Sequence, residues 1–268
     1  MHLLYASDLH GSETHFSTLL DLAVRLKPDA LLLGGDLFHN SDPVLTAPVA
    51  QRREADLAFA DWCRAAPCPV YWIAGNHEWR STVDPVPAAG TYVHGKCVAL
   101  GDWDLIGFTL TSPTPYWLID HERREAKHER PEVRGRCWSS DGTTAVPTEA
   151  RAWLAAHPTV LDELRTLPEP RAWRRTILMA HDPPFDSGLD LRWGNQPVGS
   201  HDVRHFLLAR QPAISLHGHI HEAPLLTGKP LHIVGATHGF NAGRVRQGAR
   251  ALWLDPDRPA DYKLFETK

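Results

Sequence analysis

The chain has 268 residues, of which 43% are hydrophobic and 22% are charged, as is ordinary for a soluble globular protein. Its formal net charge of -4 provides no broad basic surface for tight, non-specific binding to nucleic acid. No stretch approaches the roughly 18 consecutive apolar residues of a membrane-spanning helix, so a membrane protein is not expected.

Short apolar runs predict the strands of the fold. The runs are continuous rather than alternating, which is typical of strands that are buried on both faces of a sheet. In chain order, we expect such strands at 3–7, 30–35, 70–75, 176–180 and 213–218. Further runs without obvious helices between them predict strands of a mixed or second sheet at 103–110, 230–237, 251–254 and 262–266.

Helical patterns lie between the strands. Apolar residues recur at helical spacing over 13–26, 49–65, 148–166 and 201–210. Pro147 precedes the third of these segments, and Ser200 is a suitable N-cap for the fourth. Because strands and helices alternate, the sequence predicts an α/β sandwich. We find no repeat and no strong domain boundary, and we therefore expect one domain over residues 1–268.

Polar residues directly follow five of the predicted strands. They are Asp8, Asp36, the pair Asn76 and His77, His181, and His219. In open α/β sheets, the carboxyl ends of the strands form the edge where ligands bind. His10 and His221 each lie two residues further on, and residues i and i+2 of an extended segment face the same side. We therefore expect these side chains to converge.

The residue types of this set suit divalent cations. Carboxylate, amide oxygen and imidazole groups are ligands of hard or borderline metal ions. Two cations about 3.5–4 Å apart need an anionic ligand that bridges them, because bare like charges repel, and the Asp36 carboxylate is able to bridge. Gly34, Gly35, Gly75 and Gly218 stand just before these residues, where they permit tight turns and close approach of the backbone.

The same residues carry a family resemblance. They lie in the segments SDLHG (7–11), GGD (34–36), GNHE (75–78), AHDPP (180–184) and GHIH (218–221). In this order, each after an apolar run, the segments resemble the signature blocks of the calcineurin-like metallophosphoesterases over roughly residues 3–235. Two further stretches, 93–117 and 181–207, are similar to a branch of small prokaryotic phosphoesterases.

The resemblance implies a four-layer α/β/β/α metallophosphoesterase sandwich with mixed sheets and a centre of two divalent metal ions. In the family pattern the first metal is held by Asp8, His10 and His221, the second by Asn76, His181 and His219, and both by Asp36. His77 binds no metal in this pattern. It contacts the phosphate together with Asn76, and it protonates the leaving oxygen or stabilises its negative charge.

Departures from the family pattern bear on the substrate. Glu78 stands where most relatives have an aspartate that orients the histidine, as in the protein serine/threonine phosphatases, but Ala74 replaces the arginine of that branch. The segment LFHNSD (37–42) replaces its aspartate-arginine-glycine run, so a protein phosphatase is not expected. The segment GATHGFNAGR (235–244) differs from the asparagine-proline-glycine turn of the narrower branch, which leaves substrate choice open.

Other features have competing interpretations. His217 fits the alternation of histidines but not the family ligand set, and we interpret it as a core or supporting histidine. Arg192 is a candidate phosphate contact. The charged segment 121–136 is typical of a solvated helix or mobile loop; the alternative is a cover over the active site that offers arginines to a phosphate.

The resemblance therefore implies a metal-dependent phosphoric ester hydrolase in which a metal-bridging hydroxide attacks phosphorus in line. A phosphodiesterase is the favoured activity, with a phosphomonoesterase or nucleotidase, and then a nuclease, as alternatives. A non-catalytic protein-binding scaffold of the same fold is an alternative of a different class. Such a scaffold should have lost metal ligands or His77, all of which are present here.

The expected cofactors are two divalent ions from among manganese, iron, zinc, nickel and magnesium, with manganese favoured. The expected partner is a small phosphoester; neither nucleic acid nor a membrane is indicated, and the sequence does not determine the oligomeric state. The four cysteines have no C-x-x-C spacing, and the N-terminal residues lack the features of a signal peptide. We therefore expect a cytoplasmic protein with reduced thiols.

Overall fold

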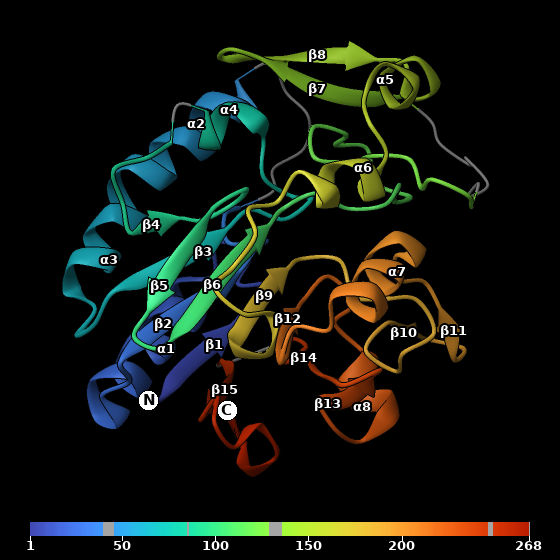
Figure 1. Cartoon of the computed structure of the whole chain (residues 1–268). Coiled ribbons are helices and arrows are strands. Elements are labelled where there is room, and N and C mark those ends of the chain that lie inside the picture. Colours follow the sequence, from blue (N-terminus) through green and yellow to red (C-terminus); the bar gives the residue numbers. More distant parts are fainter. Residues whose placement is uncertain (40–45, 85, 129–135, 246–248, 268) are drawn as a thin grey trace.

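The computed structural model describes residues 1–39, 46–84, 86–128, 136–245 and 249–267 and is built around two six-stranded sheets (Figure 1). The first sheet has the order β16-β15-β1-β2-β3-β4. Its parallel strands are β1 (Leu3–Ala6), β2 (Ala30–Gly34), β3 (Val70–Ile73) and β4 (Thr91–Tyr92). β15 (Arg250–Leu254) pairs antiparallel with β1, and β16 (Lys263–Glu266) pairs antiparallel with β15.

The second sheet has the order β13-β14-β12-β9-β6-β5. Its parallel strands are β6 (Trp103–Phe108), β9 (Thr176–Ala180), β12 (Ile214–His217) and β14 (Thr237–Asn241). β5 (Cys97–Leu100) and β13 (Leu231–Val234) lie antiparallel at its two edges. Both sheets are therefore mixed, as expected.

The central strands β1 and β2 are apolar and fully buried because both faces of their sheet are covered. On β1, Leu3 and Tyr5 pack between the two sheets, whereas Leu4 and Ala6 pack under the helices of the outer face. All four side chains are fully buried. Alternate residues of a strand point to opposite faces, so a strand that is covered on both sides has no position for a solvated side chain.

Helices cover the outer faces of the sheets. On the first sheet lie α1 (Glu13–Leu26), α3 (Ala60–Ala65) and the π-helical turn Ala55–Phe59, and α2 (Ala47–Glu54) extends the same helical stretch. On the second sheet lie α6 (Val160–Arg165) and α7 (His201–Arg210). The expected four-layer α/β/β/α sandwich is thereby confirmed (Figure 1).

Short elements complete the described chain. They are the hairpin of β7 (Cys137–Asp141) and β8 (Thr144–Thr148), the hairpin of β10 (Leu191–Arg192) and β11 (Gln196–Pro197), α4 (Arg80–Val83), α5 (Ala150–Ala156), α8 (Ala223–Thr227), and 3₁₀ turns at Trp173–Arg175 and Pro259–Asp261. Within the described ranges, no helix has the length and apolar character needed to cross a membrane.

Two predicted elements are wrong in their extent. The helix expected at 148–166 is two helices, α5 and α6, because Pro158 has no N–H group for a continuing helix and Thr159 begins α6 in a capping box with Asp162. The strand expected at 230–237 is also divided. Gly235, with φ of +62°, lies in the turn between the end of β13 and the start of β14.

The charged segment 121–136 was expected to be a solvated helix or mobile loop, and the part that the structure describes contains no helix. Glu122 and Glu125 are buried. Glu122 Oε1 accepts hydrogen bonds from the backbone N and Oγ1 of Thr114, and Glu125 Oε2 accepts one from the backbone N of Asp202 at 2.8 Å. These bonds offset the cost of burying the acidic groups. Residues 129–135 lie outside the described residues.

Candidate metal centre

The loops that follow β1, β2 and β12 have an unusual backbone. Asp8, His10, Asp36 and His219 have φ of +59°, +48°, +52° and +66°, in the left-handed region that residues other than glycine rarely adopt. Such conformations cost about 1–3 kcal/mol each, and they cluster at functional sites where the surrounding structure enforces them. Here Asp8 N donates to Gly35 O at 2.9 Å and His10 N donates to Asp36 O at 2.8 Å, which joins two of these loops.

Two glycines allow the loops to approach one another closely. A Cβ atom on Gly75 would collide with the side chains of Asp36 and His181, and one on Gly218 would collide with Ser7 and Asp8. The backbone at both glycines therefore lies close to neighbouring side chains, as the sequence predicted.

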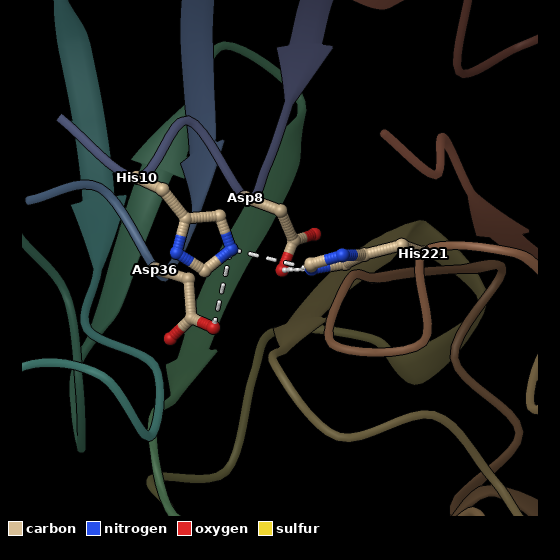
Figure 2. Close-up of side chains that lie close together, drawn as sticks. All are labelled: Asp8, His10, Asp36 and His221. Atoms are coloured by element: carbon tan, nitrogen blue, oxygen red, sulfur yellow. Dashed lines mark hydrogen bonds and ion pairs between the residues drawn. The ribbon is translucent and has the colours of Figure 1, made fainter. Parts of the chain in front are cut away.

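One group of possible metal ligands consists of Asp8, His10, Asp36 and His221, whose donor atoms all lie within 4.8 Å of one another. Figure 2 shows the two imidazoles and the two carboxylates pointing toward a common space. His10 Nε2 lies 3.3 Å from His221 Nε2 and 3.9 Å from Asp36 Oδ2. His221 Nε2 lies 3.3 Å from Asp8 Oδ1. Residues more than 200 positions apart in the chain are thus brought together.

A second group consists of Asp36, His181 and His219, whose donor atoms also lie within 4.8 Å of one another. His181 Nε2 lies 3.4 Å from Asp36 Oδ1 and 3.2 Å from Asn76 Oδ1. The ring of His219 lies 5.2 Å from that of His181, measured between centroids. Asp36 belongs to both groups, so its carboxylate lies between them, as a bridging ligand must.

Hydrogen bonds from the backbone orient these side chains. His181 Nδ1 lies 2.7 Å from the carbonyl oxygen of Gly34 and donates a hydrogen bond to it, so the ring is oriented with Nε2 toward Asp36 and Asn76. The N–H of His219 donates to both carboxylate oxygens of Asp8, at 3.0 and 3.2 Å. Second contacts of this kind commonly fix the ligands of metal sites.

The electrostatics of the site favour a positive charge. Although burial opposes ionisation, nearby histidines hold the pKa values of the Asp8 and Asp36 carboxyl groups below their usual range. Burial lowers the pKa of His10 to about 4 and that of His219 to about 3, so both imidazoles are neutral at pH 7, as metal ligands must be. At His181 the Asp36 charge outweighs burial and raises the pKa to about 10. The negative charge that stabilises a proton on His181 would also stabilise a bound cation.

The donor set fits divalent metal ions. Asn76 Nδ2 is buried and has no hydrogen-bond partner among the described residues, whereas Asn76 Oδ1 faces His181. This orientation presents the amide oxygen, rather than the amide nitrogen, to the second group. Carboxylate, imidazole and amide oxygen together form a mixed oxygen and nitrogen shell of the kind that manganese, iron, zinc and nickel accept.

His77 lies beside the two groups without belonging to either. Its Nε2 atom lies 3.9 Å from Asp36 Oδ2, and its ring packs edge-on against that of His10 with centroids 4.8 Å apart. The backbone N of His77 donates to Asp36 Oδ1 at 2.9 Å, and its carbonyl accepts a hydrogen bond from Gln51. The imidazole is therefore held at the edge of the site, where it could contact a substrate.

Glu78 joins two of the loops that carry these side chains. Its buried carboxylate accepts hydrogen bonds from the backbone N–H groups of Asp36, Leu37, Phe38 and Gly75, at 2.6 to 3.1 Å. Burial and the neighbouring Asp36 charge raise the pKa of Glu78 to about 8, and the N–H groups of Gly75 and Phe38 counteract this rise. The residue thus positions the backbone around Asp36.

We predict that Glu78→Gln destabilises the metal-free protein by roughly 3 kcal/mol, because a single amide oxygen cannot accept all four N–H groups and a buried unpaired donor costs about 1–3 kcal/mol. Urea unfolding measures the change. Glu54→Gln is the control, since Glu54 accepts hydrogen bonds from His39 near the surface. Equal effects of the two substitutions would contradict the positioning role of Glu78.

A cavity of about 690 Å³ opens over the site and includes Asp36, His77, His219 and His221 in its lining. This volume lies within the usual range of small-molecule pockets. Arg192 also lines the cavity, and its Nε donates to Gln196 Oε1 at 3.1 Å. Since a neutral amide holds this guanidinium, its charge is available to a bound anion, and the role of Arg192 as a phosphate contact stays a prediction.

His217 lies outside both donor groups and is fully buried. Its Nδ1 atom lies 2.8 Å from the carbonyl oxygen of Ala180 and 3.1 Å from that of Asp182, and its Nε2 atom lies 2.9 Å from Ser215 Oγ. The ring therefore supports the segment that carries His181. This placement agrees with the interpretation of His217 as a supporting histidine.

Sequence reasoning missed three residues of this region. Glu78 was noted only as a departure from the aspartate of most relatives, and its hydrogen bonds to four backbone N–H groups were not predicted. Tyr116 and Trp193 line the cavity and had no assigned role. Both aromatic residues lie in loops without a periodic pattern. The sequence offered one signal for them, since Pro115 and Gly194 are their neighbours and mark loops. An aromatic side chain in a loop rarely belongs to the core and is therefore a candidate for ligand binding.

Comparisons with known proteins agree with this geometry. The family model described as calcineurin-like phosphoesterase matches residues 1–223. One solved structure aligns over 100% of this chain and 99% of its own at 15% identity, with a TM-score of 0.63. The TT1561 protein of Thermus thermophilus aligns over 100% of this chain and 99% of its own at 16% identity, with a TM-score of 0.56. These two likenesses show the fold alone.

More distant comparisons add nothing on activity. A structure described as a novel archaeal phosphodiesterase aligns over 99% of both chains at 9% identity, with a TM-score of 0.42, which is too distant to support an inference about this chain. No curated protein matches the chain at a significant level.

Proposed function

This chain belongs to the calcineurin-like phosphoesterase family, and we propose that it is an enzyme that hydrolyses a small phosphodiester with two divalent metal ions. The observation that carries the proposal is the convergence of two donor groups on Asp36, which lines one cavity together with His77. In this proposal the first metal is held by Asp8, His10 and His221, the second by Asn76, His181 and His219, and both by Asp36.

Divalent cations bound in these positions supply Lewis acidity toward a phosphoryl group and lower the pKa of a water molecule. The protein supplies orientation and a proton. The imidazole of His77 lines the cavity beside Asp36, where it is placed to protonate the leaving oxygen of the ester. The hydrogen bond from the backbone N of His77 to Asp36 Oδ1 holds the His77 backbone next to the proposed metal-binding carboxylate.

The lining of the cavity supports direct attack by water. Among the described residues that line it, the one aliphatic hydroxyl belongs to Thr114, whose Oγ1 donates to Glu122 Oε1 at 2.6 Å. A hydroxyl that is engaged with a buried carboxylate in this way is not directed at a substrate. We therefore propose a single displacement at phosphorus without a covalent enzyme intermediate.

The charge of the cavity supports a diester over a monoester. Within the described lining, Arg192 is the one arginine or lysine, and Glu222 contributes a negative charge. A phosphodiester carries one negative charge, whereas a phosphomonoester carries close to two at neutral pH and needs more cationic contacts. The balance of charges in the lining therefore favours the diester.

Turnover of matched esters tests the proposed function. We expect the Mn(II)-loaded protein to hydrolyse bis(4-nitrophenyl) phosphate faster than 4-nitrophenyl phosphate, with 4-nitrophenol release as the readout and Asp36→Asn protein, purified in parallel, as the background. Faster cleavage of the monoester would replace the proposal by a phosphomonoesterase. An absence of turnover above background with both esters would favour a non-catalytic scaffold.

We further propose manganese as the bound metal and the cytosol as the compartment. The mixed oxygen and nitrogen donors support manganese, although they also accept iron, zinc and nickel. Cys63, Cys68, Cys97 and Cys137 are all free thiols, which is typical of proteins in a reducing compartment.

A further inference from the structure

The cavity has an aromatic arm beside the metal centre. We define the arm by Tyr116, Phe185, Trp193 and His201, all of which line the cavity. Tyr116 is 50% exposed and Trp193 is 67% exposed. Among the described Phe, Tyr and Trp side chains, these are the two that are largely exposed. Exposed aromatic rings inside a concave site are typical of positions that a ligand covers.

The first wall of the arm is continuous with the proposed proton donor. The ring of Tyr116 lies edge-on to that of His77, with centroids 5.3 Å apart. The loop that carries Tyr116 is held rigidly, because Pro113 and Pro115 restrict its backbone and Thr114 Oγ1 accepts a hydrogen bond from Tyr116 N at 3.2 Å. A ring that packs on Tyr116 would therefore lie next to the oxygen that His77 protonates.

The second wall is tied to the loop that carries a proposed metal ligand. Trp193 lies in the turn of the β10–β11 hairpin, and its backbone N donates to Oε1 of Glu222 at 3.2 Å, next to His221. Phe185 and His201 stack with centroids 3.8 Å apart and an interplanar angle of 25°. Pro197, Val198 and Ile220 add apolar surface to the same lining. Most of the side chains on this side of the lining are thus aromatic or apolar.

We propose that the aromatic arm binds a planar ring carried by the leaving group of the phosphoester, so that the substrate is the ester of a nucleoside or of an aryl alcohol rather than of a simple alkyl alcohol or of a sugar without a base. This assignment rests on the proposed function for the position of the phosphate. The ring stacks on Trp193 and Tyr116, and the cavity of about 690 Å³ has room for a ligand of this size. Exposed aromatic side chains stack on many types of planar ring. The feature that the arm recognises is therefore a planar ring rather than one particular base or aryl group.

Equilibrium binding to the metal-free protein tests the arm apart from hydrolysis. Adenosine and phenyl phosphate are the ring-bearing probes, and ribose and methyl phosphate are their ring-free counterparts, with dissociation constants measured by titration calorimetry. We expect at least one ring-bearing probe to bind about tenfold more tightly than its counterpart. Binding of adenosine alone would identify a nucleoside as the source of the ring, and binding of phenyl phosphate alone a small aryl ester.

Substitutions assign the binding to the arm. Trp193→Ala should weaken binding of the preferred probe about tenfold, which corresponds to about 1.4 kcal/mol. Trp193→Phe should restore most of the affinity, because it restores a ring on which the ligand stacks. Because Trp193 is largely exposed, neither change should disturb folding. Ile233→Ala is the control, because Ile233 is 57% exposed and does not line the cavity.

Two outcomes would contradict ring binding by the aromatic arm. One is equal affinity for both members of each probe pair, and the other is equal affinity of the Trp193→Ala and Ile233→Ala proteins for the preferred probe. If the protein binds the ring-bearing probes but shows no ester turnover after metal loading, the proposed function is wrong and the proposal of ring binding by the aromatic arm is retained. The two failures are therefore distinguishable.

Discussion

Asp36→Asn is expected to lower kcat for an aryl phosphodiester by on the order of 10³-fold or more and to reduce the metal content of the protein. Asp36 belongs to both donor groups, with Oδ2 facing His10 and Oδ1 facing His181. An amide of the same shape removes the negative charge that offsets the repulsion between two cations, so both sites should weaken together. Steady-state kinetics and elemental analysis of the same preparation measure the two effects.

The fold should survive this substitution, because the Asn side-chain oxygen is able to accept the hydrogen bond from His77 N that Asp36 Oδ1 accepts. Asp104→Asn is the matched control. Asp104 is also a buried carboxylate, but it pairs with Arg171 away from the site. Wild-type turnover by the Asp36→Asn protein, or the loss of one metal ion with the other retained at full affinity, would contradict the bridging role.

His77→Ala is expected to lower kcat by about 10²-fold or more while the metal content stays unchanged, because His77 lies beside the donor groups and is absent from both. The loss should be larger for an ester with a poor alkyl leaving group than for one that releases 4-nitrophenol. A good leaving group departs without protonation, whereas an alkoxide needs the proton that His77 supplies. Comparing the two esters therefore separates proton donation from simple phosphate binding.

His39→Ala is the matched control for this prediction. His39 lies in the same loop as Asp36, but its side chain is exposed and pairs with Glu54. We expect this variant to keep both its metals and its turnover. If His77→Ala protein instead lost a metal ion, His77 would have to be counted among the metal ligands.

Much of the fold could be predicted because the strands are covered on both faces. Such strands read as continuous apolar runs, and their ends are marked by the first polar residue. Asp8, Asp36 and His181 stand at such ends, so the same signal predicts the proposed ligands and the ends of the strands. The parallel arrangement then places these ends at one edge of each sheet.

The elements that were missed are short and bounded by local effects. The β10–β11 hairpin has two residues in each strand, too few to show any periodicity. The break between α5 and α6 depends on Pro158 and on a capping box, which the helical pattern of 148–166 obscures. Short segments of this kind obtain their conformation from tertiary contacts, which composition and spacing do not reveal.

The parts of the site that could not be predicted depend on contacts between distant segments. Nothing in the sequence near Glu78 indicates that its carboxylate binds three consecutive N–H groups at 36–38. The burial of Glu122 and Glu125 is equally invisible, because a charged segment reads as solvated unless its hydrogen-bond partners are known. The left-handed conformations of Asp8 and Asp36 also appear only in the folded chain.

The metal content of the purified chain tests the dinuclear centre most directly. Protein loaded with Mn(II), freed of excess metal by dialysis and measured by elemental analysis should contain about two ions per chain, and its electron paramagnetic resonance spectrum should show two coupled ions. A content near zero, or two ions without magnetic coupling, would contradict a centre shared through Asp36.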